Sequence, residues 1–203
     1  MAGARPAYDE MWGAGGNAAG TAPTPPYRDY CAWYDSADPA FLKAKAADCE
    51  RIFRRTGITF NVYGQEDAAE RLIPFDIVPR IFSASEWRRL ARGIEQRVRA
   101  INAFLYDIYH RQEILRAGRV PTQLIASNKA FLPEMIGVDP PGGVYTHIVG
   151  VDIVRTGPDD FYVLEDNART PSGVSYMLEN RETMLQMFPE LFARVRVREV
   201  SDY

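Results

Sequence analysis

The stretch from residue 144 to residue 181 constrains the fold most, because its side-chain pattern changes from strand to turn, strand, loop and helix. Residues 144–155 are rich in β-branched and aromatic side chains, which strands prefer. Residues 157–160 (GPDD) supply turn chemistry, and residues 161–167 resume the strand pattern. We therefore predict a β-hairpin over 144–167, a polar loop over 168–173 and a helix over 174–187.

The predicted hairpin gathers oxygen-bearing side chains on one face. If residues 157–160 form a four-residue loop, Asp152 lies opposite Glu165 and Gly150 lies opposite Asn167. Two like charges opposite each other destabilise a sheet unless a cation lies between them. Two carboxylates and an amide oxygen suit Mg²⁺, or Mn²⁺, better than zinc. The alternative is an ordinary solvated hairpin face.

The loop at 168–173 (ARTPSG) adds groups that bind anions. Arg169, Thr170 and Ser172 would form an anion cradle together with backbone N–H groups where a helix starts at Gly173. In the alternative interpretation, Ser172 only caps that helix.

Several stretches, in the same order, resemble a known family. They run from about Phe75 to Phe192 and read PFDIVPRIF, QRVRAINAFLYDIY, FLPEMIGVDPPGG, VLEDNARTPSGVSYMLENR and MFPELF. The pattern D-x(12)-E-x-N followed by a T-P-S loop is similar to the metal-binding hairpin of circularly permuted ATP-grasp ligases. Glutathionylspermidine synthetases and eukaryotic-type glutathione synthetases are the characterised relatives. The resemblance is strongest to the bacterial group called circularly permuted ATP-grasp type 2.

The resemblance implies a fold, a cofactor and a reaction. The fold is α/β (α+β), the N-terminal part of an ATP-grasp-like fold, with a mixed or antiparallel sheet whose metal-site hairpin is flanked by helices. Asp152, Glu165 and Asn167 would hold Mg²⁺ bridging the phosphates of ATP. Thr170 and Ser172 would lie against the transferring phosphoryl group or the acyl substrate. ATP would phosphorylate a carboxylate, and an amine would attack the acyl phosphate to form an amide-type bond.

One position departs from that pattern. Glutathionylspermidine synthetases carry an arginine two residues before the first aspartate, where this chain has Gly150. The role of that arginine would pass to Arg80, Arg155 or Arg169, or the substrate differs. Arg80 either points into a phosphate site or forms a structural ion pair. The expected substrates are therefore only a small-molecule or peptide carboxylate and an amine.

Local signals outline the rest of the chain. Residues 1–26 are mostly Ala, Gly and Pro, which predicts a flexible arm, or a small docking patch at Tyr8, Met11 and Trp12. Residues 27–203 are expected to form a partial ATP-grasp domain. Helices are expected at 39–55, between an Asp38 cap and Gly57, and at 84–109 after a capping box. Short strands are expected at 58–63 and 72–78.

Composition excludes some functions and favours a compartment. The 203 residues are 46% hydrophobic and 25% charged, as in a globular protein, and a net charge of −3 argues against a general nucleic-acid binder. No membrane-spanning run is present in the sequence. Two cysteines, Cys31 and Cys49, fit a reducing cytoplasm.

The lysines bear on whether the chain can act alone. Lys43, Lys45 and Lys129 are the only ones, and none lies in a glycine-rich loop that could hold phosphates. In the resembled family, much of the nucleotide clamp follows the metal hairpin. We therefore expect the front part of a longer ligase, inactive without its C-terminal region. The alternatives are a non-catalytic binding or scaffold domain with the same fold and, less favoured, a hydrolase using Asp152 and Glu165.

Overall fold

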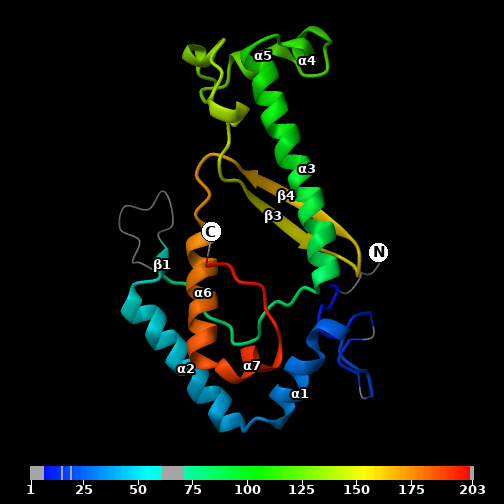
Figure 1. Ribbon diagram of the computed structural model, residues 1–203, viewed down its shortest axis with the longest axis vertical. Coiled ribbons are helices and arrows are strands. Elements are labelled where there is room, and N and C mark those ends of the chain that lie inside the picture. The colour runs from blue at the N-terminus through cyan, green and yellow to red at the C-terminus, as the bar shows by residue number, and fades with distance from the viewer. Residues whose placement is uncertain (1–6, 15, 19, 61–70, 202–203) are drawn as a thin grey trace, which may run out of the picture. The chain divides into compact units, whose positions relative to one another are not determined.

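A computed structural model describes residues 7–14, 16–18, 20–60 and 71–201. The chain divides into two compact units (Figure 1). The first contains residues 1–83, 155–162 and 172–203, and the second contains residues 84–154 and 163–171. The domain predicted over 27–203 therefore contributes to both units. No helix in the described part of the chain is long and apolar enough to span a lipid bilayer.

The first unit packs helices from both ends of the sequence. These are η1 (Pro25–Tyr27), α1 (Arg28–Ser36), α2 (Pro39–Thr56), α6 (Gly173–Met187) and α7 (Pro189–Arg194). Helix α6 contacts α2 and α7, and α7 contacts α1 (Figure 1). Their apolar faces enclose a core in which the ring of Phe188 meets that of Trp33 edge-on, with centroids 5.5 Å apart.

Helix α2 begins and ends where the sequence predicts. The side chain of Asp38 accepts a hydrogen bond from the backbone N–H of Ala40, which satisfies one of the free donors of the first turn. Gly57 ends the helix with a φ of 75°, a left-handed conformation that glycine adopts without strain. The chain then forms β1 (Thr59–Phe60), paired antiparallel with β2 (Arg71–Leu72). The remainder of the strand predicted at 58–63 lies outside the described residues.

The N-terminal turn packs onto the same core. The carboxylate of Asp9 accepts hydrogen bonds from the backbone N–H groups of Met11 and Trp12, both at 2.9 Å. The side chains of Met11 and Trp12 lie against the buried cluster. These two large apolar side chains thus bury surface against the core. Residues 1–6, 15 and 19 of the N-terminal segment lie outside the described residues.

The second unit is built along α3 (Ala84–Tyr109), which has the predicted bounds. The chain continues through α4 (Glu113–Arg116), α5 (Thr122–Ala126), η2 (Pro133–Met135), η3 (Pro141–Gly143), β3 (Gly150–Arg155) and β4 (Phe161–Asn167). At the end of α3, the carboxylate of Asp107 accepts the backbone N–H groups of Glu113 and Ile114, both at 2.9 Å. These bonds turn the chain into α4, and the bond from Ile114 is the main reason that the pKa of Asp107 is lowered.

The first strand of the hairpin is shorter than predicted. It begins at Gly150 rather than at residue 144. The side-chain oxygen of Asn102 in α3 accepts the backbone N–H groups of Tyr145 at 2.7 Å and Thr146 at 3.1 Å. These donors bind a side chain of α3 in place of a strand partner, and residues 144–149 lie outside the strand.

The turn of the hairpin is also tighter than predicted. The backbone N–H of Thr156 donates to the carbonyl oxygen of Asp160 at 3.0 Å. Three residues therefore lie between the bonded pair, one fewer than predicted. Gly150 nevertheless lies against Asn167, as in the predicted pairing of the two strands. Strands β3 and β4 still pair as a two-stranded sheet, as the sequence predicts (Figure 1).

Candidate functional site

Strand β4 presents different acidic residues to its two faces. Asp166 points towards α3, where its carboxylate receives Arg97 Nε at 2.7 and 2.8 Å and Arg97 Nη2 at 2.6 Å. These hydrogen bonds lower the pKa of Asp166 and raise that of Arg97. Because side chains alternate along a strand, Glu165 and Asn167 point to the face away from α3.

On that outer face, the structure brings Asp152 and Asn167 together. The amide nitrogen Nδ2 of Asn167 lies 3.4 Å from Oδ2 of Asp152. Gly150 lies against Asn167, since a Cβ built on this glycine would be 3.5 Å from the Asn167 Cβ. Asp152 and Glu165 are both exposed, so a ligand can reach their carboxylates.

The donor set of this face suits a magnesium ion that also binds phosphate. Magnesium is usually held by one or two carboxylates, with phosphate and water oxygens completing its shell. Asp152 and Glu165 supply two carboxylates, and a half-turn of the Asn167 amide would exchange its nitrogen for an oxygen ligand. In the part of the chain that the structure describes, no three His, Cys, Asp or Glu side chains gather as a metal cluster. A site here would therefore depend on the amide and on the phosphates.

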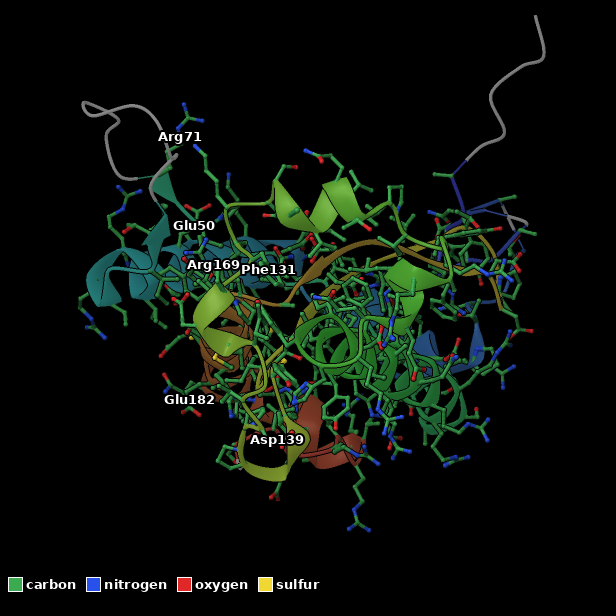
Figure 2. All side chains as sticks on the ribbon, turned by 90° about the horizontal axis from the view of Figure 1, so that it is seen from above. Glu50, Arg71, Phe131, Asp139, Arg169 and Glu182 are labelled. Carbon is green, nitrogen blue, oxygen red and sulfur yellow. The ribbon has the colours of Figure 1, made fainter. Side chains whose placement is uncertain are left out.

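The loop after β4 leaves its polar side chains in solvent. Arg169 and Thr170 are exposed and belong to the second unit, and Ser172 and Gly173 are exposed and belong to the first. Arg169 is labelled in Figure 2. Ser172 is the residue before α6, but its side chain makes no capping hydrogen bond. The capping interpretation of this serine is therefore not realised, and its hydroxyl group is available to a ligand.

The other two predicted arginines are engaged within the first unit. Arg80 binds both oxygens of Glu10, with Nε at 2.8 Å from one and Nη2 at 2.6 Å from the other. Arg80 therefore forms an ion pair, and these bonds raise the pKa of Arg80. The side chain of Arg155 is only 5% exposed. Of the three candidates to replace the arginine missing at Gly150, Arg169 is exposed, whereas Arg80 is paired with Glu10 and Arg155 is almost fully buried.

Sequence reasoning missed Asp166, Arg97 and Glu10. A signal existed for Asp166, because a strand with acidic residues on both faces needs a basic partner on the covered face. The sequence could not say which arginine of α3 that partner is. Glu10 lies in an Ala- and Gly-rich segment and gave no comparable signal.

Comparison with known proteins agrees with the resemblance. The sequence model of a family described as a circularly permuted ATP-grasp matches residues 79–203. An uncharacterized protein of Mycobacterium leprae is 49% identical over 97% of this chain, which covers 34% of that protein. An uncharacterized protein of Synechocystis is 40% identical over 97% of this chain and 40% of its own length.

A third relative carries a provisional activity in its name. A Frankia casuarinae protein, provisionally named glutamate–cysteine ligase 2-2, is 36% identical over 91% of this chain, which covers 20% of that protein. The chain thus spans between about a fifth and two fifths of the length of these relatives. With a family model matching more than half of its residues, the chain belongs to the circularly permuted ATP-grasp family.

Proposed function

We propose that this chain supplies the magnesium-binding hairpin of an ATP-dependent carboxylate–amine ligase. The observation that carries the proposal is the approach of the Asn167 amide to the Asp152 carboxylate, 3.4 Å apart on the exposed face of the hairpin. Glu165 shares that face by strand alternation. Membership of the ATP-grasp family and the provisional ligase name of the Frankia relative support the reaction class.

In this proposal Asp152, Glu165 and Asn167 would hold Mg²⁺, which would neutralise charge on the phosphates of ATP. The γ-phosphoryl group of ATP would pass to the carboxylate of the acid substrate, giving an acyl phosphate and ADP. The amine would then attack the acyl carbon and lose a proton, so that the amide bond forms as inorganic phosphate leaves. Arg169 and Thr170 face solvent beside the hairpin and bind the transferring phosphoryl group or the acyl oxygen.

The chain does not have to carry every part of the reaction. Its relatives are about two and a half to four and a half times as long as this chain, and the adenine pocket and the lysines that hold phosphates are assigned to that additional length. The expected partners are therefore this additional region, a carboxylate and an amine.

The test compares variants of the proposed ligands with a variant elsewhere on the same hairpin. ATP turnover is measured in a protein that contains this chain together with the additional length found in its relatives. Glu165→Gln and Asn167→Ala should each reduce ATP turnover at least a hundredfold, with unchanged circular dichroism. Asp160→Asn removes an exposed carboxylate from the turn of the hairpin and should keep full turnover.

A second measurement separates the ligase from a non-catalytic scaffold. Isothermal titration should show ATP binding that requires Mg²⁺ in the same protein and is lost in Glu165→Gln. ATP binding without any dependence on metal, or turnover unchanged in both ligand variants, would remove the proposed site. Absence of all nucleotide binding would favour the scaffold.

A further inference from the structure

Two arginines of the first unit converge on one carboxylate. Glu10 receives the fork of Arg80, with nitrogen–oxygen distances of 2.8 and 2.6 Å. Nη1 of Arg155 lies 3.9 Å from Oε1 of the same Glu10. The Glu10 side chain is 16% exposed and that of Arg80 is 50% exposed, so the cluster opens to solvent on the Arg80 side.

The support beneath both arginines comes mainly from parts of the fold other than the N-terminal segment. The guanidinium of Arg80 lies over the ring of Phe82, 5.3 Å from its centroid. Arg155 lies over Phe161 at 5.0 Å and donates to two carbonyl oxygens of the hairpin turn, at 3.1 and 2.6 Å. Of these stacking contacts, only the one between Arg155 and Tyr8, at 5.1 Å, comes from the N-terminal segment. Both guanidinium groups therefore keep most of their supporting contacts without Glu10.

The carboxylate reaches this place from a turn that is fixed elsewhere. The hydroxyl group of Thr24 donates to the carbonyl oxygen of Glu10, and its backbone N–H donates to that of Met11, both at 2.7 Å. Glu10 and Arg80 are 70 residues apart in the sequence. The carboxylate of Glu10 is therefore placed between the two arginines by a separate segment, as that of a ligand would be.

We infer that Arg80 and Arg155 form a binding site for an oxyanion group, carboxylate or phosphate, which Glu10 occupies in cis. A planar guanidinium fork matches the two oxygens of either group, and the aromatic faces beneath the arginines hold the forks in position. A ligand tethered to the same chain has an effective concentration of the order of millimolar, so it competes strongly with a free anion. The inference concerns only the first unit and stands or falls separately from the magnesium site of the second.

The experiment removes the charge of Glu10 and measures anion binding to the chain. Glu10→Gln keeps the size of the side chain and ends the competition. Inorganic phosphate and glutarate are titrated separately, by calorimetry, into the original chain and into the variant. At least one of the two anions should bind the variant with a Kd at least tenfold lower, and which one does so identifies the group that the site prefers. Adding Arg80→Gln to the Glu10→Gln variant should abolish this gain in anion affinity.

A matched ion pair in the other unit provides the control. Arg97 and Asp166 have exposed fractions of 46% and 19%, close to those of Arg80 and Glu10, but the carboxylate there receives one arginine. Asp166→Asn also frees a guanidinium fork, that of Arg97, but the variant should gain no comparable affinity for phosphate or glutarate. An equal gain in this control would mean that any freed arginine binds anions, and would overturn the inference.

A second variant covers the case in which Glu10→Gln does not fold. Glu10→Asp keeps the charge and draws the carboxylate back by one methylene, so it should weaken the competition and lower the Kd less than Glu10→Gln. If neither variant that folds binds phosphate or glutarate better than the original chain, the cluster is a structural ion pair alone.

Discussion

Gly150 is the position where a single methyl group would test the geometry of the candidate site. A Cβ at this glycine would lie 3.1 Å from the Cβ of Pro171 and 3.5 Å from the Cβ of Asn167. Carbon atoms pack best at about 3.5–4.0 Å. The contact with Pro171 is thus too short by a few tenths of an ångström, and the proline ring has little freedom to move away. The same glycine occupies the position of the arginine in the resembled synthetases.

We expect Gly150→Ala to destabilise the second unit by about 1 kcal/mol. Forcing an extra methyl into a packed contact costs about 1–3 kcal/mol. The lower conformational entropy of alanine in the unfolded chain offsets about 0.4–1 kcal/mol of that cost. The larger side chain of an arginine at position 150 would displace Pro171 and its loop further. The close contact between this loop and β3 therefore requires the glycine.

Urea denaturation followed by circular dichroism measures this change, with Gly93→Ala as the matched control. Gly93 lies inside α3 in the same unit, and a Cβ there would meet nothing within 4 Å. Its replacement by alanine should stabilise the unit by about 0.5–1 kcal/mol. If Gly150→Ala raised the stability as much as Gly93→Ala does, Pro171 would not be held against the strand. The side-chain amide signals of Asn167 in NMR should shift in Gly150→Ala and stay in place in Gly93→Ala.

Two further predictions concern the parts that hold the site in place. The pKa of Asp166 is lowered by Arg97, so the pair stabilises the fold above the unfolded-state pKa of about 4 and loses its effect as the pH falls below that value. The difference in urea midpoint between the original chain and Asp166→Asn should thus shrink from pH 7 to pH 3, and an unchanged difference would contradict the role of the ion pair. Phe188 is fully buried against Trp33, so Phe188→Ala should cost about 3–5 kcal/mol in urea denaturation. A loss below 1 kcal/mol would show that this core is not tightly packed.

The elements that the sequence predicts well are those with local signals. Helix α2 has a cap at Asp38 and a left-handed glycine at Gly57, and both act within a few residues of the helix they limit. Helix α3 has an apolar stripe over its whole length, and its bounds are as predicted. The hairpin was predicted from alternation and turn residues, which are also local.

The elements that the sequence predicts poorly depend on contacts between residues that are distant in the chain. The strand was expected to begin at residue 144, but Asn102, 43 and 44 residues away, accepts the backbone N–H groups of Tyr145 and Thr146. In the same way, Arg80 is paired with Glu10, which is 70 residues distant. No pattern within a short window of sequence indicates such partners, because their effect comes from the tertiary fold.

The bond between Arg97 and Asp166 bears on which side a substrate must approach. A strand has a period of two residues, so fixing Asp166 against α3 commits Glu165 and Asn167 to the other face. A shift of one residue would bury both of these oxygen donors against a helix and leave Asp166 alone in solvent. The ion pair thus selects the alternation that keeps the candidate metal ligands exposed. In the proposed ligase, ATP and the additional region of the protein reach the hairpin from the face opposite α3.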